Sequence, residues 1–137
     1  MFSRACEYAI KIMIYIASNQ QENRKTGLKE VTEAIGSPEA FTAKILQQLV
    51  KSGLLESYKG PSGGFLLSQR EVKLRDIVAT IDGNKLMEKC VLGFDECGSE
   101  NPCPVHDKFA LVRRQINETL LSIDVRDQSL GQKLVDK

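Results

Sequence analysis

The sequence predicts a mostly α-helical fold with one small β-hairpin, followed by a long helix near the C-terminus. Three observations lead to this fold class. Apolar residues recur at spacings of three and four in residues 3–18 and again in residues 107–123. Two shorter amphipathic stretches meet at a glycine. A glycine-rich turn over residues 59–64 then joins two short apolar runs, as in a β-hairpin.

The length indicates one domain, or one compact domain that carries an extension. The chain has 137 residues, is 42% hydrophobic and contains no Trp, so its core is expected to be aliphatic. The longest apolar run, near residues 10–17, is interrupted by Lys11, so no membrane partner is expected. Without a secretory signal pattern at the start, we expect a cytoplasmic protein. Thiols stay reduced there, and clustered cysteines more often indicate metal or redox chemistry than disulfides.

The charge is distributed unevenly along the chain. The net charge is only +1, but residues 1–70 hold nine Lys/Arg against six Asp/Glu, whereas residues 71–137 hold ten against twelve. The first half therefore carries +3 and the second half −2. This asymmetry permits the first half to bind nucleic acid without requiring it.

The first two helices follow from periodicity and capping residues. The helix over residues 3–18 is expected to bury one stripe, which consists of Ala5, Ala9, Ile12, Met13 and Ile16. A polar loop is expected over residues 19–25. Thr26 is then predicted to cap a short helix over residues 28–34, which Gly36 ends.

A third helix is expected to begin at Ser37 and Pro38 and to end at residues 52–53. Its predicted core face consists of Phe41, Thr42, Ile45, Leu46 and Leu49. The opposite face consists of Ala40, Ala43, Lys44, Gln47 and Lys51. Small residues together with Lys and Gln allow a helix to lie deep in a DNA major groove. On this helix alone, an ordinary solvated face is an equally good interpretation.

The hairpin that follows favours DNA binding. Strands are expected over residues 54–58 and 65–68, and a hairpin directly after a helix-turn-helix is a wing. Its tip has few side chains, so backbone amides can approach phosphates or a minor groove. A plain surface hairpin is the alternative, and an ATPase loop is disfavoured because no Gly-Lys-Ser/Thr follows. The predicted DNA-contacting residues are Ala40, Phe41, Ala43, Lys44, Gln47, Lys51, Lys59, Gly60, Ser62 and Gly63.

A cysteine-rich loop follows the winged segment. Cys90, Cys97 and Cys103 lie within seventeen residues of one another together with His106, the only histidine. Thiolate and imidazole are ligands for zinc, copper and iron–sulfur clusters. Glycines and prolines in the segment break regular structure, so a loop able to surround an ion is expected. The spacing lacks the paired Cys-x-x-Cys motifs of most structural zinc sites, which disfavours zinc without excluding it.

These motifs together resemble the bacterial winged-helix regulators typified by IscR and NsrR. The resemblance rests on Leu-Val-Lys-Ser-Gly-Leu-Leu at the end of the third helix, the wing Lys-Gly-Pro-Ser-Gly-Gly-Phe-Leu-Leu and the cysteine loop. It implies a homodimer that binds double-stranded DNA and holds an iron–sulfur cluster. Such a cluster senses cluster supply, iron, redox state or nitric oxide. The histidine three residues after the third cysteine matches the IscR-type fourth ligand.

Four states of the loop remain open. A 2Fe–2S cluster bound by Cys90, Cys97, Cys103 and His106 is favoured. A 4Fe–4S cluster is the second alternative, with Glu7 of the partner chain as an extra ligand, as the NsrR resemblance suggests. Zinc in a Cys3His set and free thiols in a redox switch are the others.

Three further interpretations concern the cysteines as a whole. Cys6 is expected to be a core residue without a ligand role. A thiol enzyme that uses Cys103 and His106 is disfavoured, because three cysteines exceed its needs and no oxyanion loop is evident. A cluster-free interaction module is disfavoured by the intact ligand set.

The second half is expected to form a support helix over residues 72–81, packed under the wing, and the long helix. On the long helix, a seam of Phe109, Val112, Ile116 and Leu120 is predicted to form the dimer contact. Packing onto its own domain is the alternative. A palindromic site requires two recognition helices about 34 Å apart, which favours the dimer. The predicted divisions are a winged helix-turn-helix domain (1–82), a cluster-binding loop (83–106), a dimerisation helix (107–125) and a flexible tail (126–137).

Overall fold

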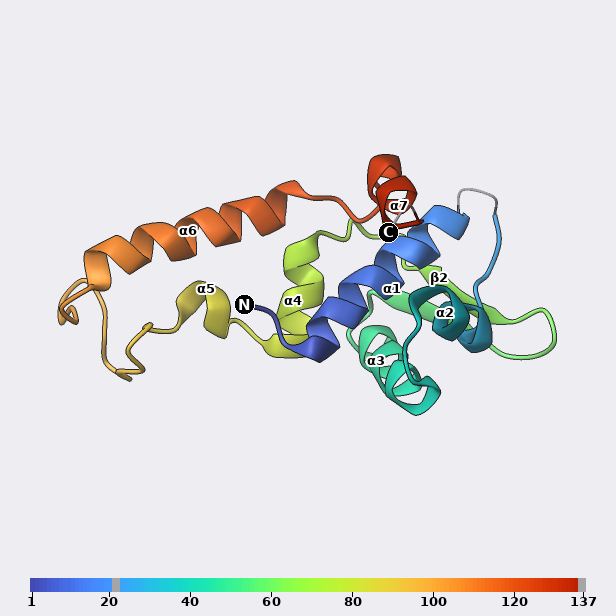
Figure 1. The fold of residues 1–137 in the computed structure, drawn as a ribbon, viewed down its shortest axis with the longest axis horizontal. Coiled ribbons are helices and arrows are strands. Elements are labelled where there is room, and N and C mark those ends of the chain that lie inside the picture. The colour runs from blue at the N-terminus through green and yellow to red at the C-terminus, as the bar shows by residue number, and fades with distance from the viewer. Residues whose placement is uncertain (21–22, 136–137) are drawn as a thin grey trace.

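The structure, a computed structural model, describes residues 1–20 and 23–135 and confirms a mostly helical fold with a two-stranded antiparallel hairpin. Its elements are α1 (Arg4–Gln20), α2 (Leu28–Ile35), α3 (Glu39–Lys51), β1 (Leu55–Tyr58), β2 (Gly64–Leu67), α4 (Leu74–Asp82), α5 (Lys85–Glu88), α6 (His106–Ser122) and α7 (Gln128–Val135). Figure 1 shows α1–α4 and the hairpin packed together, with α6 extending away from them above α5. The loop predicted over residues 19–25 begins later, because α1 continues to Gln20, and two of its positions, 21–22, lie outside the described residues.

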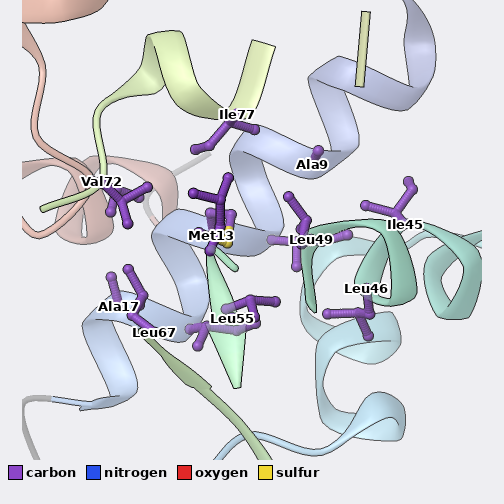
Figure 2. Close-up of a cluster of buried hydrophobic side chains, with 14 of the residues drawn as sticks. Ala9, Met13, Ala17, Ile45, Leu46, Leu49, Leu55, Leu67, Val72 and Ile77 are labelled. Carbon is purple, nitrogen blue, oxygen red and sulfur yellow. The ribbon is translucent and has the colours of Figure 1, made fainter. Parts of the chain in front are cut away.

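The core is built around α1. Ala9, Ile12, Met13 and Ile16 are fully buried, as the apolar stripe predicted. Figure 2 shows how side chains from α3, both strands and α4 gather around Met13. This core fixes the relative positions of α3 and the hairpin, because both pack against α1.

The turn between α2 and α3 ends as expected but begins differently. Gly36 adopts a left-handed φ of 72° and its amide donates to the Thr32 carbonyl, which ends α2. Thr26 does not cap α2; Gly27 occupies that position without a side-chain hydrogen bond. Ser37 likewise does not cap α3, because its hydroxyl pairs with that of Thr42 inside the turn.

Thr26 serves the wing instead. Its backbone exchanges two hydrogen bonds with Phe65, of 3.1 and 2.8 Å, so Thr26 forms an isolated antiparallel bridge to β2. Gly64 has a φ of 139°, and a Cβ there would stand 2.9 Å from the Thr26 carbonyl oxygen. Glycine is therefore required where these two backbones meet.

Helix α4 packs against α1, α3 and α6, and its Ile77 lies in the same core cluster as Leu55 and Leu67 of the hairpin. A second apolar cluster joins it to the long helix and consists of Cys6, Val78, Met87 and Leu120. Met87 belongs to α5, a single helical turn within the segment predicted to be a loop. Residues 83–106 therefore begin with an anchored turn beneath α6.

The C-terminal segment is helical where a flexible tail was predicted. Helix α7 packs against α1, and Gly131 approaches Ser18 so closely that a Cβ would stand 2.8 Å from the Ser18 Cβ. The spacing of Leu130 and Leu134 is too short a pattern to have indicated this helix. Residues 136–137, the end of the predicted tail, lie outside the described residues. Among the helices of residues 1–20 and 23–135, none is long and apolar enough to cross a bilayer.

Candidate metal centre and nucleic-acid interface

The three clustered cysteines converge next to the N-terminal end of α6. Their Sγ atoms all lie within 4.8 Å of one another, and those of Cys90 and Cys103 are 3.7 Å apart. Each side chain is half-buried. The cysteine loop, residues 89–105, and the wing tip lie at opposite ends of the long axis of the molecule (Figure 1). Any effect of this centre on DNA contacts must therefore pass through the fold.

Backbone turns bring the sulfurs together. Gly93 has a φ of 79°, and its amide bonds back to the Cys90 carbonyl. Gly98 and Asn101 exchange backbone hydrogen bonds of 3.3 and 3.2 Å, which close the next turn. The Cys103 amide donates to Cys97 Sγ at 3.4 Å. The glycines that the sequence marked as helix breakers thus allow the reversals that the site needs.

His106, the first residue of α6, extends the site. Its Nδ1 lies 3.3 Å from Cys97 Sγ. Two sulfurs bound to one tetrahedral ion through bonds of ~2.3 Å stand about 3.8 Å apart. The spacing of Cys90 and Cys103 agrees with that value, and Cys97 with His106 forms a second close pair. The donor set therefore fits a thiolate-bound metal centre.

The electrostatics of the thiols favour a cation among them. At Cys90, removal from water opposes ionisation, but hydrogen bonds from the Phe94 and Leu92 amides outweigh it and lower the pKa to about 7. At Cys97, the Cys103 amide favours the thiolate, but removal from water and the neighbouring sulfurs of Cys90 and Cys103 outweigh it and raise the pKa. Three thiolates so close together repel one another, and a positive ion removes that repulsion.

Cys6 and Glu7 stand apart from this centre. Cys6 is fully buried, and burial, followed by the nearby Asp82 carboxylate, raises its pKa to about 12. It is a core residue, as predicted. Glu7 is exposed on the first turn of α1 and does not belong to the three-cysteine group within its own chain.

Helix α3 presents the polar face that the sequence predicted. Ala40, Lys44, Gln47 and Lys51 are exposed, Ala43 is half-buried, and Ile45, Leu46 and Leu49 are buried on the opposite side. A groove of about 390 Å³ runs between this face and the wing, bordered by Ala43, Gln47, Lys51 and Phe65. Phe41 differs from the rest of the predicted DNA-contacting set. Its ring packs edge-on against Tyr8, 5.6 Å between centroids, and is half-buried against the core.

The wing tip is exposed over Lys59, Gly60 and Ser62, while Gly63 is half-buried. A Cβ at Gly63 would stand 2.2 Å from the Tyr58 carbonyl oxygen, so the turn closes only with glycine there. Sequence reasoning missed Lys25, whose Nζ lies 4.6 Å from the centre of the Tyr58 ring. Only the pairing of Thr26 with Phe65 brings this charge to the wing, so no local pattern could have indicated it.

The predicted dimer seam on α6 is divided in two. Phe109 and Val112 are 38% and 49% exposed, but Leu120 is only 4% exposed and Ile116 packs against the second apolar cluster. Leu120 is therefore a contact within its own chain, because it packs in the second apolar cluster with Val78 of α4 and Met87 of α5. Together with Met1, Leu86 and Val91, the exposed pair lines an apolar groove of about 400 Å³.

A model of the Rrf2 family, described as an iron-dependent transcriptional regulator, matches residues 2–128. The chain belongs to the Rrf2 family. Among curated relatives, an Aquifex aeolicus protein assigned as an HTH-type transcriptional regulator is 30% identical over 131 residues, covering 93% of this chain and 90% of the relative. The regulator IscR of Photorhabdus laumondii is 25% identical over 131 residues, covering 94% and 79%. The regulator NsrR of Geobacillus kaustophilus is 28% identical over 108 residues, covering 77% and 71%.

Solved structures show that the Rrf2 chain has the winged-helix fold. CymR, the global cysteine regulator of B. subtilis, superimposes with a TM-score of 0.79 at 21% identity, covering 95% of this chain and 97% of CymR. IscR of T. potens superimposes with a TM-score of 0.70 at 24% identity, covering 97% and 88%. The predicted winged helix-turn-helix with a long helix is confirmed.

Membership of the Rrf2 family answers two of the questions that the sequence left open. Rrf2 proteins are transcriptional regulators that bind DNA, so DNA binding by this chain is supported. Its relatives and structural neighbours are regulators and not enzymes, which sets aside the thiol-enzyme interpretation of Cys103 and His106. The three close cysteines of this Rrf2 chain fit a metal or iron–sulfur site.

Proposed function

We propose that this chain is a homodimeric transcription regulator whose cysteine loop holds an iron–sulfur cluster that controls binding to a palindromic DNA site in the cytoplasm. One observation carries the proposal. Three cysteine sulfurs lie within 4.8 Å of one another at the start of α6, and the His106 Nδ1 lies 3.3 Å from one of them, Cys97 Sγ.

The ligand set favours a 2Fe–2S cluster. In such clusters each iron takes two protein ligands, and histidine can replace cysteine. The close pairs Cys90 with Cys103, at 3.7 Å, and Cys97 with His106, at 3.3 Å, match this division. When bound, the cluster supplies a centre whose assembly and oxidation state respond to cluster supply, iron, redox state or nitric oxide. A 4Fe–4S cluster with Glu7 of a partner chain is the second candidate, and zinc on the same four residues is the third.

DNA recognition is assigned to α3 and the wing. Gln47 stands on the exposed face of α3, where its amide can donate to base edges in the major groove, and the Lys44 ammonium on the same face can reach phosphates. Lys51 borders the groove beside the wing, and Lys59 stands on the wing tip, both suited to phosphates. We exclude Phe41 from this set, since its ring supports the helix from the core side.

We assign the dimer contact with a second copy of the chain to the exposed half of α6. Phe109 and Val112 are large apolar residues exposed on a helix, beside an apolar groove. Covering them with the same helix of a partner would bury this surface and place two recognition helices on one DNA duplex. Leu120 takes no part in this contact.

The loop residues themselves set the geometry of the junction with α6. Cys90 follows α5, whereas Cys103 and His106 lead into α6, so ligands that hold them together order the loop at the start of the dimer helix. Deprotonating these ligands and ordering the loop costs free energy, which metal–thiolate bonding offsets. Release of the ligand frees the loop and shifts the start of α6. Two recognition helices on a fixed half-site spacing then lose or change specific affinity.

Anaerobic purification tests the centre. Visible absorption with two irons and two sulfides per chain supports the 2Fe–2S assignment, whereas a colourless protein with one zinc supports the zinc site. Cys97→Ala should abolish loading, while Cys6→Ala, the matched control in the core, should retain it.

DNA affinity tests the control. A duplex selected from a random library is titrated with loaded protein, metal-free protein and the Cys97→Ala variant at one salt concentration. Coupling of about 5- to 150-fold between loaded and metal-free protein is expected. Equal affinities for all three would make this protein a constitutive DNA binder and refute the sensing role.

A further inference from the structure

The segment that leaves α6 is attached to the base of the wing. The Leu74 amide donates to the Ile123 carbonyl and the Val125 amide donates to the Val72 carbonyl, both at 3.0 Å. Val125 is only 1% exposed and belongs to the main core. Residues 123–126, called the strap below, therefore lie antiparallel to the residues that join β2 to α4.

Arg126 extends this attachment to the end of β2. Its guanidinium donates to the carbonyl of Ser68, the residue directly after the strand, and to the Arg70 carbonyl at 3.0 Å. Its own amide is held by the Asp124 carboxylate at 2.8 Å. A planar guanidinium can reach two carbonyls from a fixed position, which a lysine ammonium on its flexible stem does less well. The strap thus holds the wing base through side chain as well as backbone.

The other end of the strap continues into α6 without an intervening flexible segment. Helix α6 has 17 residues, about 25 Å of helix, and begins at His106 beside the cysteine centre. Its C-terminal half is seated on α4 by Leu120 and by a 2.6 Å hydrogen bond from Arg75 to Asn117. A displacement at the start of this helix therefore reaches the strap as movement of a rigid rod.

We infer that the strap transmits the position of α6 to the wing, with Arg126 as the positioning residue that sets the wing for DNA. The inference rests on the proposed function for the signal that moves α6, but the attachment itself is independent of it. The hairpin and α3 share the core around α1, but the wing base is held in addition by the strap and by Gln20, which accepts the Leu67 amide at 2.8 Å. The wing is therefore the DNA-binding element through which α6 acts.

The first experiment measures the ratio of DNA affinities between cluster-loaded and metal-free protein, with a duplex selected from a random library. In the wild type this ratio is expected to be about 5- to 150-fold. In Arg126→Ala it is expected to lie within about twofold of one, because the coupling is lost. Arg126→Lys keeps the charge without the fork and should retain part of the ratio. Lys133→Ala removes a positive charge from the exposed face of α7 and should keep all of it.

The second experiment requires no cluster. Amide hydrogen exchange at Leu67 and Ser68 is followed in metal-free protein after α6 is loosened by Leu120→Ala, or by the milder Leu120→Val should the first variant unfold. Exchange should become faster in the wild-type background. Adding the same change to Arg126→Ala should produce no further acceleration, because the connection is already broken. A merely structural Arg126 would give two additive effects instead.

The two experiments separate the inference from the proposed function. An affinity ratio equal to that of the wild type in a folded and loaded Arg126→Ala protein overturns the inference that the strap transmits the position of α6. A wild-type ratio of one refutes the sensing role, and the exchange data then decide on the strap alone. Additive exchange effects overturn it, and non-additive effects support it.

Discussion

The salt dependence of DNA binding tests the assignment of α3 and the wing most directly. Lys44 is exposed on the outward face of α3 and Lys59 is exposed at the wing tip, so both ammonium groups can reach phosphates. Replacing either with alanine removes one positive charge per chain without opening the core. In a dimer, each variant therefore loses two phosphate contacts.

The magnitude follows from counterion release. Each phosphate contact contributes about 0.9 to the slope of log affinity against log salt, so each variant should flatten the slope by about 1.8. Between about 50 and 200 mM salt, the wild-type affinity should then fall roughly twelvefold more than that of the variant. Combining both variants should flatten the slope by about 3.6, because the two positions lie on separate elements.

Fluorescence anisotropy with a labelled duplex over a salt series measures these slopes. Lys133→Ala on α7 serves as the matched control, and its slope should equal that of the wild type. If Lys44→Ala and Lys59→Ala both retain the wild-type slope and affinity, neither α3 nor the wing contacts phosphates as proposed. A flattened slope for only one of them would place the other element away from the DNA.

Three further outcomes are expected. Val112→Glu should yield monomers in sedimentation runs, because Val112 is exposed on α6; a fully dimeric variant would show that another surface forms the dimer. In metal-free protein, the rate at which Cys90 reacts with iodoacetamide should rise about tenfold per pH unit and level off above its pKa of about 7. Cys6, with its pKa of about 12, should stay unmodified. Equal labelling of the two cysteines in mass spectra would contradict this. Gly63→Ala should weaken DNA binding at unchanged α-helix content, because its Cβ would meet backbone; an affinity equal to that of the wild type would show that the wing tolerates the distortion.

Local patterns in the sequence determined the helices and their faces. The apolar stripe of α1 and the two faces of α3 follow from a period of 3.6 residues, and the structure buries Ile12, Met13, Ile45 and Leu49 accordingly. The cysteine set was equally evident, because soft ligands separated by helix-breaking residues leave few structural alternatives. These features depend on residues close in sequence, so they need no knowledge of the remaining chain.

Contacts between distant segments decided the rest. Thr26 has the side chain of a helix cap, but its backbone pairs with Phe65, and Leu120 continues a helical seam but is buried against α4 and α5. Arg126 stands in a segment that reads as a polar tail, yet it holds carbonyls 56 and 58 residues away. The free energy of each such contact depends on what the fold brings opposite the residue. A local pattern shows that a side chain can cap, pack or donate, and only the tertiary structure selects its partner.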